Sequence, residues 1–159
     1  MQIYTISFFG HRDFSEEAKI EKHLMDFLRD FILEKECINF LIGKEGDFDF
    51  FVSSVIKRAV LQYGWGNTHF TLVLPYAKSD FYKNKEDYLN YYDDVEICAK
   101  AAAAHPKAAI QIRNREMVDR SDLVLCYVIH SKGGAYQTQK YAQKSGKKTI
   151  NLAQWINEK

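Results

Sequence analysis

The chain alternates short, almost wholly apolar runs with longer segments in which apolar residues recur every three or four positions. The apolar runs are rich in β-branched and aromatic residues and predict buried strands at residues 2–9, 38–43, 69–75, 123–129 and 148–152. The longer segments predict helices with one apolar face: one capped by Ser15, one from about residue 50, and two at 107–120 and 137–145.

Strands that alternate with helices, and that are apolar along their whole length, are typical of a parallel sheet covered on both faces. We therefore predict an α/β fold: a Rossmann-like three-layer sandwich with a mainly parallel sheet of about five strands, in one domain over residues 1–159. Residues 77–94 interrupt the alternation, because they are polar and rich in tyrosine. They predict a long loop with room for a helical turn, and long loops in compact domains are often functional lids.

Charge and composition limit the classes of binding partner that we expect for this chain. Lys and Arg number 22 and Asp and Glu 21, a balance that argues against general nucleic-acid binding but leaves a local basic patch open. The three cysteines lie far apart and the five histidines are scattered, so we expect no disulfide, no metal site and no cofactor. No leader or membrane-spanning run is evident, which indicates a cytoplasmic protein without a membrane partner. A homo-oligomer stays open.

Polar residues gather directly after the predicted strands. Gly10, His11 and Arg12 follow the first strand, and the run GKEGDFD begins at Gly43 after the second. Ligands of parallel sheets bind at the carboxyl ends of the strands, so these loops are expected to form one site. Gly10, Gly43 and Gly46 would let the backbone turn or approach a ligand closely.

The run GKEGDFD also supplies carboxylates. Glu45 and Asp49 are candidates for a ribose-binding group or a general base, since a carboxylate accepts hydrogen bonds from sugar hydroxyls. Asp47 is a further ligand-binding candidate. The alternative is structural: Asp47 or Asp49 caps the helix that follows.

Two further segments suit an anion. The loop before residue 135 offers backbone N–H groups at a helix N-terminus, with hydroxyls nearby, from Ser131, Gly133, Gly134 and Thr138. It matches neither of the familiar phosphate-loop motifs, and a tight turn is the simpler reading. Arg113 and Arg115 could bind phosphate or carboxylate, or could belong to a solvated helix with charge pairs along its surface.

Taken together, the motifs resemble the SLOG superfamily, Rossmann-like domains named for the DNA-processing Smf proteins and the lonely-guy phosphoribohydrolases. The resemblance is greatest to the small YpsA/YoqJ-like branch of bacteria and their phages. It spans nearly the whole chain through FFGHRDF, GKEGDFD, LVLPY, RNREMVDRSDLVLCYV, HSKGGAYQTQKYA and GKKTINL, in that order.

The resemblance implies a site for a nucleotide or nucleotide-derived ligand. Arg113 and Met117 match the arginine–methionine motif of the lonely-guy enzymes, which cleave the N-glycosidic bond of nucleoside monophosphates. Gly133, Gly134 and Thr138 match their glycine loop after a one-residue insertion. Tyr141, however, stands where those enzymes carry the catalytic glutamate, so a replacement carboxylate would have to come from Glu45 or Asp49.

Three hypotheses follow. The first is a sensor or binding module for a nucleoside phosphate or an ADP-ribose-type ligand. The second is an N-glycosidase acting on nucleoside monophosphates, with Glu45 or Asp49 as the acidic group. The third is an interaction protein that uses residues 77–94 to bind a protein partner or a single strand. Whether the chain catalyses a reaction stays open.

Overall fold

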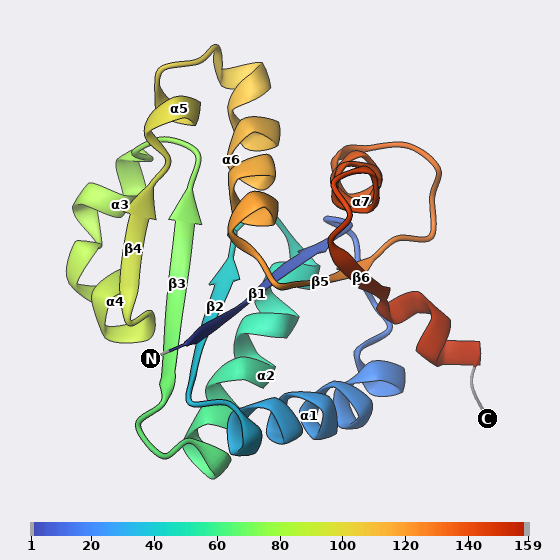
Figure 1. Cartoon of the computed structure of the whole chain (residues 1–159). Coiled ribbons are helices and arrows are strands. Elements are labelled where there is room, and N and C mark those ends of the chain that lie inside the picture. The colour runs from blue at the N-terminus through green and yellow to red at the C-terminus, as the bar shows by residue number, and fades with distance from the viewer. Residues whose placement is uncertain (1, 158–159) are drawn as a thin grey trace.

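The computed structural model describes residues 2–157 and has three layers, with helices on both faces of a central sheet (Figure 1). Within these residues six strands, all parallel, lie in the order β4-β3-β2-β1-β5-β6. The strands are β1 (Ile3–Gly10), β2 (Cys37–Ile42), β3 (Thr68–Leu74), β4 (Asp94–Ile97), β5 (Leu123–Tyr127) and β6 (Lys148–Asn151). The helices are α1 (Glu17–Glu34), α2 (Asp47–Tyr63), α3 (Ser79–Lys83), α4 (Lys85–Tyr91), α5 (Ala99–Ala102), α6 (Pro106–Arg120), α7 (Gly134–Lys144) and the 3-10 helix η1 (Leu152–Asn157).

Two apolar cores lie on opposite faces of the sheet. Helices α1 and α2 cover one face and α5, α6 and α7 cover the other. Successive side chains of a strand point to opposite faces: Ile6 and Phe8 of β1 belong to the first core, and Phe9 to the second. Both faces are therefore buried, which explains why the strands read as continuous apolar runs.

The predicted α/β fold with a parallel sheet is confirmed, and the five predicted strands are all present. The sixth strand, β4, was missed. It has only four residues, two of them acidic, and pairs with β3 alone at the edge of the sheet. An edge strand with exposed side chains has no need of apolar residues, so its sequence carries no strand signal. The short helix α5 was missed as well.

Three helix starts differ from the sequence prediction. Helix α1 begins at Glu17, and exposed Ser15 does not cap it. Helix α2 begins at Asp47, three residues earlier than expected, with Gly46 before it. Asp47 and Asp49 therefore lie in its first turn, where carboxylates stabilise the helix dipole. Helix α7 begins at Gly134 rather than at residue 137.

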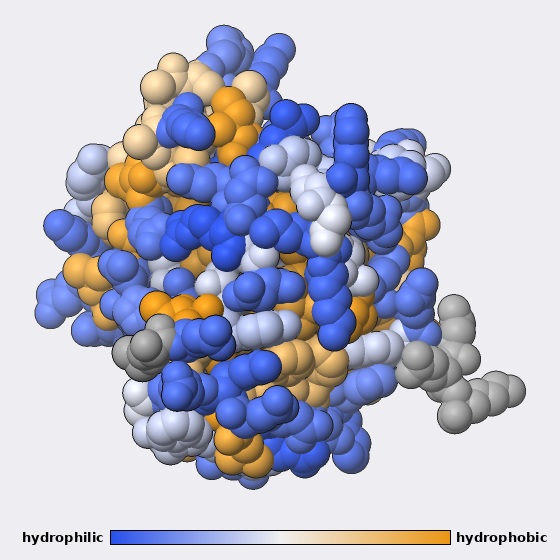
Figure 2. Space-filling model, in the orientation of Figure 1, coloured by the Kyte–Doolittle hydropathy of each residue, from blue (hydrophilic) through white to orange (hydrophobic). Residues whose placement is uncertain are grey.

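The sequence predicted a long loop at residues 77–94, but the structure differs. The segment consists mainly of the helices α3 and α4 and ends at the first residue of β4. Phe81, Tyr88 and Tyr92 are buried in the core that α1 and α2 also share, which holds the two helices against the sheet. Tyr82 and Leu89 remain exposed. On the face shown in Figure 2 hydrophilic residues predominate, and apolar residues form small separate patches.

Candidate functional site

A cavity of about 480 Å³ lies beyond the carboxyl ends of β1, β2 and β5. Strands β1 and β5 are neighbours, yet the chain leaves β1 for α1 on one face and leaves β5 for α7 on the other. The cavity therefore lies at the point where the strand order reverses, which is where open α/β sheets bind their ligands. Four segments line it: the loop after β1, the loop after β2 with the first turn of α2, helix α6, and the loop into α7.

Most of the candidate residues from the sequence meet at this cavity. Its lining includes nine of them: Gly10, His11, Arg12, Gly43, Glu45, Asp49, Arg113, Gly133 and Gly134. They come from four segments far apart in the chain. The expectation that the strand-end loops form one site therefore matches the arrangement of these nine residues.

Five other candidates lie outside the lining. Gly46 packs against the backbone of Arg12, and the N–H of Asp47 donates to the Arg12 carbonyl oxygen at 2.8 Å. Thr138 is buried and donates to the carbonyl oxygen of Gly134 at 2.9 Å. These three residues support the loops beside the cavity. Arg115 is exposed and stacks on the ring of Tyr141, and Ser131 is exposed in the loop before α7.

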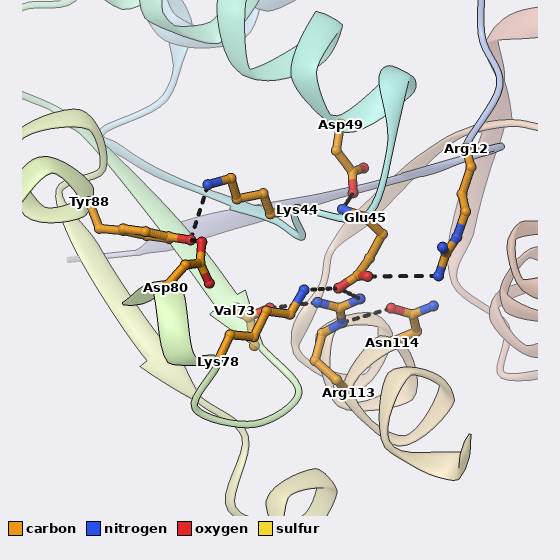
Figure 3. Close-up of polar contacts among 10 residues, drawn as sticks. All are labelled: Arg12, Lys44, Glu45, Asp49, Val73, Lys78, Asp80, Tyr88, Arg113 and Asn114. Atoms are coloured by element: carbon orange, nitrogen blue, oxygen red, sulfur yellow. Dashed lines mark hydrogen bonds and ion pairs between the residues drawn. The ribbon is translucent and has the colours of Figure 1, made fainter. Parts of the chain in front are cut away.

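Arg113 is the most unusual of the lining residues, because its side chain is 2% exposed. Its Nη1 donates to the carbonyl oxygen of Val73 at 2.7 Å, and its Nε donates to Asn114 at 2.9 Å. Its Nη2 lies 3.6 Å from Oε1 of Glu45 (Figure 3). Burial lowers the pKa of Arg113, and the carboxylates of Glu45 and Asp49 oppose this. The guanidinium is thus engaged by the protein and holds Glu45 in place.

The Glu45 carboxylate has three cationic side chains near it, from the loop after β1, the segment after β3 and helix α6. Oε1 of Glu45 also lies 3.2 Å from Nζ of Lys78, which follows β3. Oε2 has Nη2 of Arg12 at 3.9 Å, beyond hydrogen-bond distance (Figure 3). One carboxylate oxygen is therefore occupied, while the other is held only loosely by an arginine side chain that is 70% exposed.

Asp49 lies in the first turn of α2, beside Glu45. Its Oδ2 accepts a hydrogen bond from the backbone N–H of Glu45 at 2.9 Å, which closes the loop after β2. Burial raises the pKa of Asp49 to about 6, although that hydrogen bond and the charge of Arg113 act in the opposite direction. A carboxyl group with such a pKa exchanges its proton near neutral pH, as acid–base catalysis requires.

Helices α3 and α4 contact the same loop. The Lys44 ammonium lies 3.0 Å from the hydroxyl of Tyr88, which donates to Asp80 at 2.6 Å. Lys78, just before α3, contacts Glu45. Two successive residues of the loop after β2 are thus fixed by residues 77–94, and the position of Glu45 depends on this segment.

The loop into α7 brings a helix N-terminus to the cavity. Gly133 has a φ of 94°, a conformation that residues with a side chain rarely adopt, and α7 begins at the next residue. Lys107 and Gln111, one turn apart on α6, line the same cavity. Gln111 donates to the Gly134 carbonyl oxygen at 3.2 Å, which ties α6 to the first residue of α7.

Five further lining residues that carry polar groups were not among the sequence candidates: Asp13, Lys107, Gln111, Asn114 and His130. Asp13, Asn114 and His130 lie inside motifs that were already singled out, FFGHRDF, RNREMVDRSDLVLCYV and HSKGGAYQTQKYA, so the same motifs could have supplied them. Lys107 and Gln111 had no such signal. They lie in the same half of α6 as Arg113, whose guanidinium contacts Gly43 after β2, so the packing of α6 brings them to the cavity.

Within residues 2–157, no three His, Cys, Asp or Glu side chains are grouped so that they could hold a metal ion. In the same part of the chain, no helix combines the length and apolar character needed to cross a membrane.

Comparison with known proteins gave matches among solved structures. No family model matches the chain, and no curated protein matches it. DNA processing protein A (DprA) from Streptococcus pneumoniae superposes with a TM-score of 0.63 at 16% identity, over 92% of this chain and 49% of that one. DprA from Helicobacter pylori gives a TM-score of 0.56 at 16% identity, over 97% and 79%.

The fold is that of DprA. This likeness agrees with the SLOG resemblance at the level of the Rossmann-like fold. The chain spans about half the length of the S. pneumoniae protein. The H. pylori structure is described as showing a single-stranded DNA binding mode. The argument from net charge against nucleic-acid binding was therefore wrong, because a protein of this fold binds a nucleic acid, and a local site can do so whatever the net charge.

Proposed function

We propose that the cavity binds a nucleotide or nucleotide-derived ligand, of nucleoside phosphate or ADP-ribose type, and that the chain acts as a sensor or binding module. The observation that carries the proposal is the polarity of the cavity. Its lining combines the N-terminus of α7 and the side chain of Lys107 with the carboxylates of Glu45 and Asp49. A nucleotide has the complementary arrangement, with an anionic phosphate next to a ribose that donates hydrogen bonds.

The phosphate is assigned to the loop of Gly133 and Gly134. Backbone N–H groups at a helix N-terminus favour an anion, and the absence of a Cβ at Gly133 leaves room for close approach. The lining side chains Lys107 and Arg12 add positive charge at the cavity. Ser131 and Thr138, which lie outside the cavity lining, would support this loop without contacting the ligand. Arg115 would not contact the ligand either.

The ribose is assigned to Glu45. Its Oε1 is occupied by Lys78 and Arg113, whereas Oε2 has no partner within hydrogen-bond distance among the described residues. An oriented carboxylate oxygen of this kind can accept from a sugar hydroxyl. Arg113 then acts by positioning Glu45.

Calorimetric titration with nucleoside mono- and diphosphates and ADP-ribose tests this proposal. We expect binding that is weakened about tenfold or more in a Glu45→Gln variant, because a hydrogen bond to a charged group is lost. Glu36→Gln, which changes an exposed glutamate before β2, is the matched control. The absence of binding heat across the panel would refute the proposal.

A second candidate is N-glycosidic hydrolysis of a nucleoside monophosphate, favoured by the raised pKa of Asp49. Protonated Asp49 could give its proton to the departing base, while the Glu45 carboxylate stabilises the oxocarbenium-like state that water then attacks. The products would be free base and ribose phosphate, separable by chromatography. Release that persists in a Glu45→Gln, Asp49→Asn double variant would exclude this mechanism.

A third candidate is single-stranded DNA binding, supported by the H. pylori neighbour of the same fold. A strand would present its phosphates and sugars to the same cavity. Competition tests whether DNA uses this cavity: a labelled oligonucleotide that binds at low salt should then be displaced by a nucleoside monophosphate. The motif order further supports our placing the chain in the YpsA/YoqJ-like branch of the SLOG superfamily.

A further inference from the structure

Two histidines face each other at the reversal point of the sheet. His11 follows β1 and His130 follows β5, and the two strands pair up to Gly10 and Tyr127. The imidazole centroids are 4.8 Å apart, and both side chains line the cavity. The pair thus lies between the two strand ends where a ligand of this fold binds, and His130 is three residues before Gly133.

The two imidazoles are not equivalent. The backbone N–H of Ile129 donates to Nε2 of His11 at 3.0 Å, and the ring of Tyr127 packs edge-on against His11. A proton on Nε2 would break that hydrogen bond and place a charge in a partly buried site. Burial lowers the pKa of His11, and the neighbouring His130 lowers it further. Because Nε2 of His11 accepts the hydrogen bond from Ile129, the neutral ring carries its proton on Nδ1.

His130 has none of these restraints. Its side chain is exposed, and within residues 2–157 its ring makes no hydrogen bond to another residue. Around the pair stand Tyr127 of β5, Arg12 and Asp13 after β1, and Lys107 of α6 across the cavity. Lys132 follows in the same loop as His130. Because His11 is held neutral, the pair can take up one proton without placing two like charges side by side.

We propose that His130 is a phosphate-binding residue, which takes a proton from solvent when the ligand binds and donates the resulting N–H to a phosphate oxygen. The inference rests on the proposed nucleotide function and adds a ligand class to it. A terminal phosphate carries −1.5 to −2 charges near pH 7, whereas an internal phosphodiester carries one. A protonated imidazole added to the helix N-terminus therefore favours a nucleoside monophosphate over the interior of a strand.

Proton uptake is measured by titrating adenosine 5′-monophosphate, and its guanosine, cytidine and uridine counterparts, into the protein in buffers of different ionisation enthalpy. At about pH 7.5 the ligand phosphate is already ionised, so uptake reports on the protein. We expect net uptake of protons on binding, lost in His130→Gln and retained in His11→Gln. His69→Gln is the matched control, because His69 is exposed at the amino end of β3, on the opposite edge of the sheet.

Affinity gives a second measurement. His130→Gln should bind the nucleotide roughly tenfold more weakly at about pH 6.5 and approach the unmodified protein at about pH 8.5, because histidine changes charge in this range. A dinucleoside monophosphate, which has only an internal diester, should show a smaller loss. Uptake that is zero, or equal in His130→Gln and the unmodified protein, would overturn the inference. Absence of binding by every nucleotide would instead overturn the proposed function.

Discussion

The guanidinium of Arg113 lies directly against Gly43 at the end of β2: a Cβ at Gly43 would fall 2.9 Å from Nη1. The glycine after β2 is thus required for the buried arginine to reach the Val73 carbonyl oxygen. Gly43, Arg113 and Glu45 therefore depend on one another for their positions, and we call them the Gly43–Arg113–Glu45 unit.

Gly43→Ala should displace Arg113 and, with it, Glu45. We expect a loss of about 1–3 kcal/mol in the free energy of unfolding, the usual cost of overpacking, together with weaker nucleotide binding. Urea unfolding and calorimetric titration measure the two effects. Gly146→Ala is the control: its φ of 76° disfavours alanine through the backbone, whereas no atom lies within 4 Å of the added Cβ. It should lose stability and keep affinity. Equal nucleotide affinities in the two variants would contradict the coupling of Gly43, Arg113 and Glu45.

Arg113→Met should destabilise the protein by about 3–5 kcal/mol, because it removes one partner of a buried ion pair and leaves the Val73 carbonyl oxygen without its donor. Arg115→Met, two residues along α6, changes an exposed arginine that stacks on Tyr141. This control should cost less than about 1 kcal/mol. Chemical denaturation of both variants gives the comparison, and a small loss in Arg113→Met would show that the buried charge is dispensable.

The pH dependence of stability should contain a contribution from Asp49. Folding raises its pKa from 3.8 to about 6, so the folded state holds the proton more tightly. The resulting stabilisation is complete below about pH 3.8 and is lost as the pH rises through about 6. Asp49→Asn lacks this contribution. Its stability relative to the unmodified protein should therefore increase by about 3 kcal/mol between these limits.

Urea unfolding at several pH values measures this difference. Asp47→Asn, which neutralises an exposed carboxylate in the same turn of α2, controls for the general loss of a negative charge. A difference between Asp49→Asn and the unmodified protein that does not vary with pH would contradict the raised pKa.

Gly133→Ala should weaken nucleotide binding through the backbone. With a φ of 94°, an alanine at this position would be strained by about 1–2 kcal/mol, and relief of that strain would turn the first amides of α7 away from the cavity. Gly66→Ala is closely matched, with a φ of 86° and a position in the turn before β3. Both variants should lose similar stability, but only Gly133→Ala should lose affinity. Thermal unfolding measures the stability of both variants, and calorimetric titration with a nucleotide measures their affinity. An equal loss of affinity in Gly66→Ala would show that the effect does not arise from the loop before α7.

Much of the fold could be predicted because strands that are buried on both faces of the sheet have apolar residues at nearly every position, as β1, β2, β3 and β5 do. Strand β4 is not apolar along its length, since it lies at the edge of the sheet and two of its four side chains are exposed. Residues 77–94 were predicted as a loop from their polarity. Three aromatic side chains nevertheless bury themselves against the main core, and no window of sequence shows which of several tyrosines will find a partner there.

The amino-acid sequence by itself determined the alternation of strands and helices and placed glycines and polar residues at the strand ends, because both depend on neighbours along the chain. Only the tertiary structure decided that Arg113 is buried as the counter-ion of Glu45, that Lys107 and Gln111 reach the cavity, and that His11 and His130 meet across it. Each of these depends on contacts between segments far apart in sequence. Burial and electrostatic environment arise from such contacts, and they set the chemistry available to each side chain.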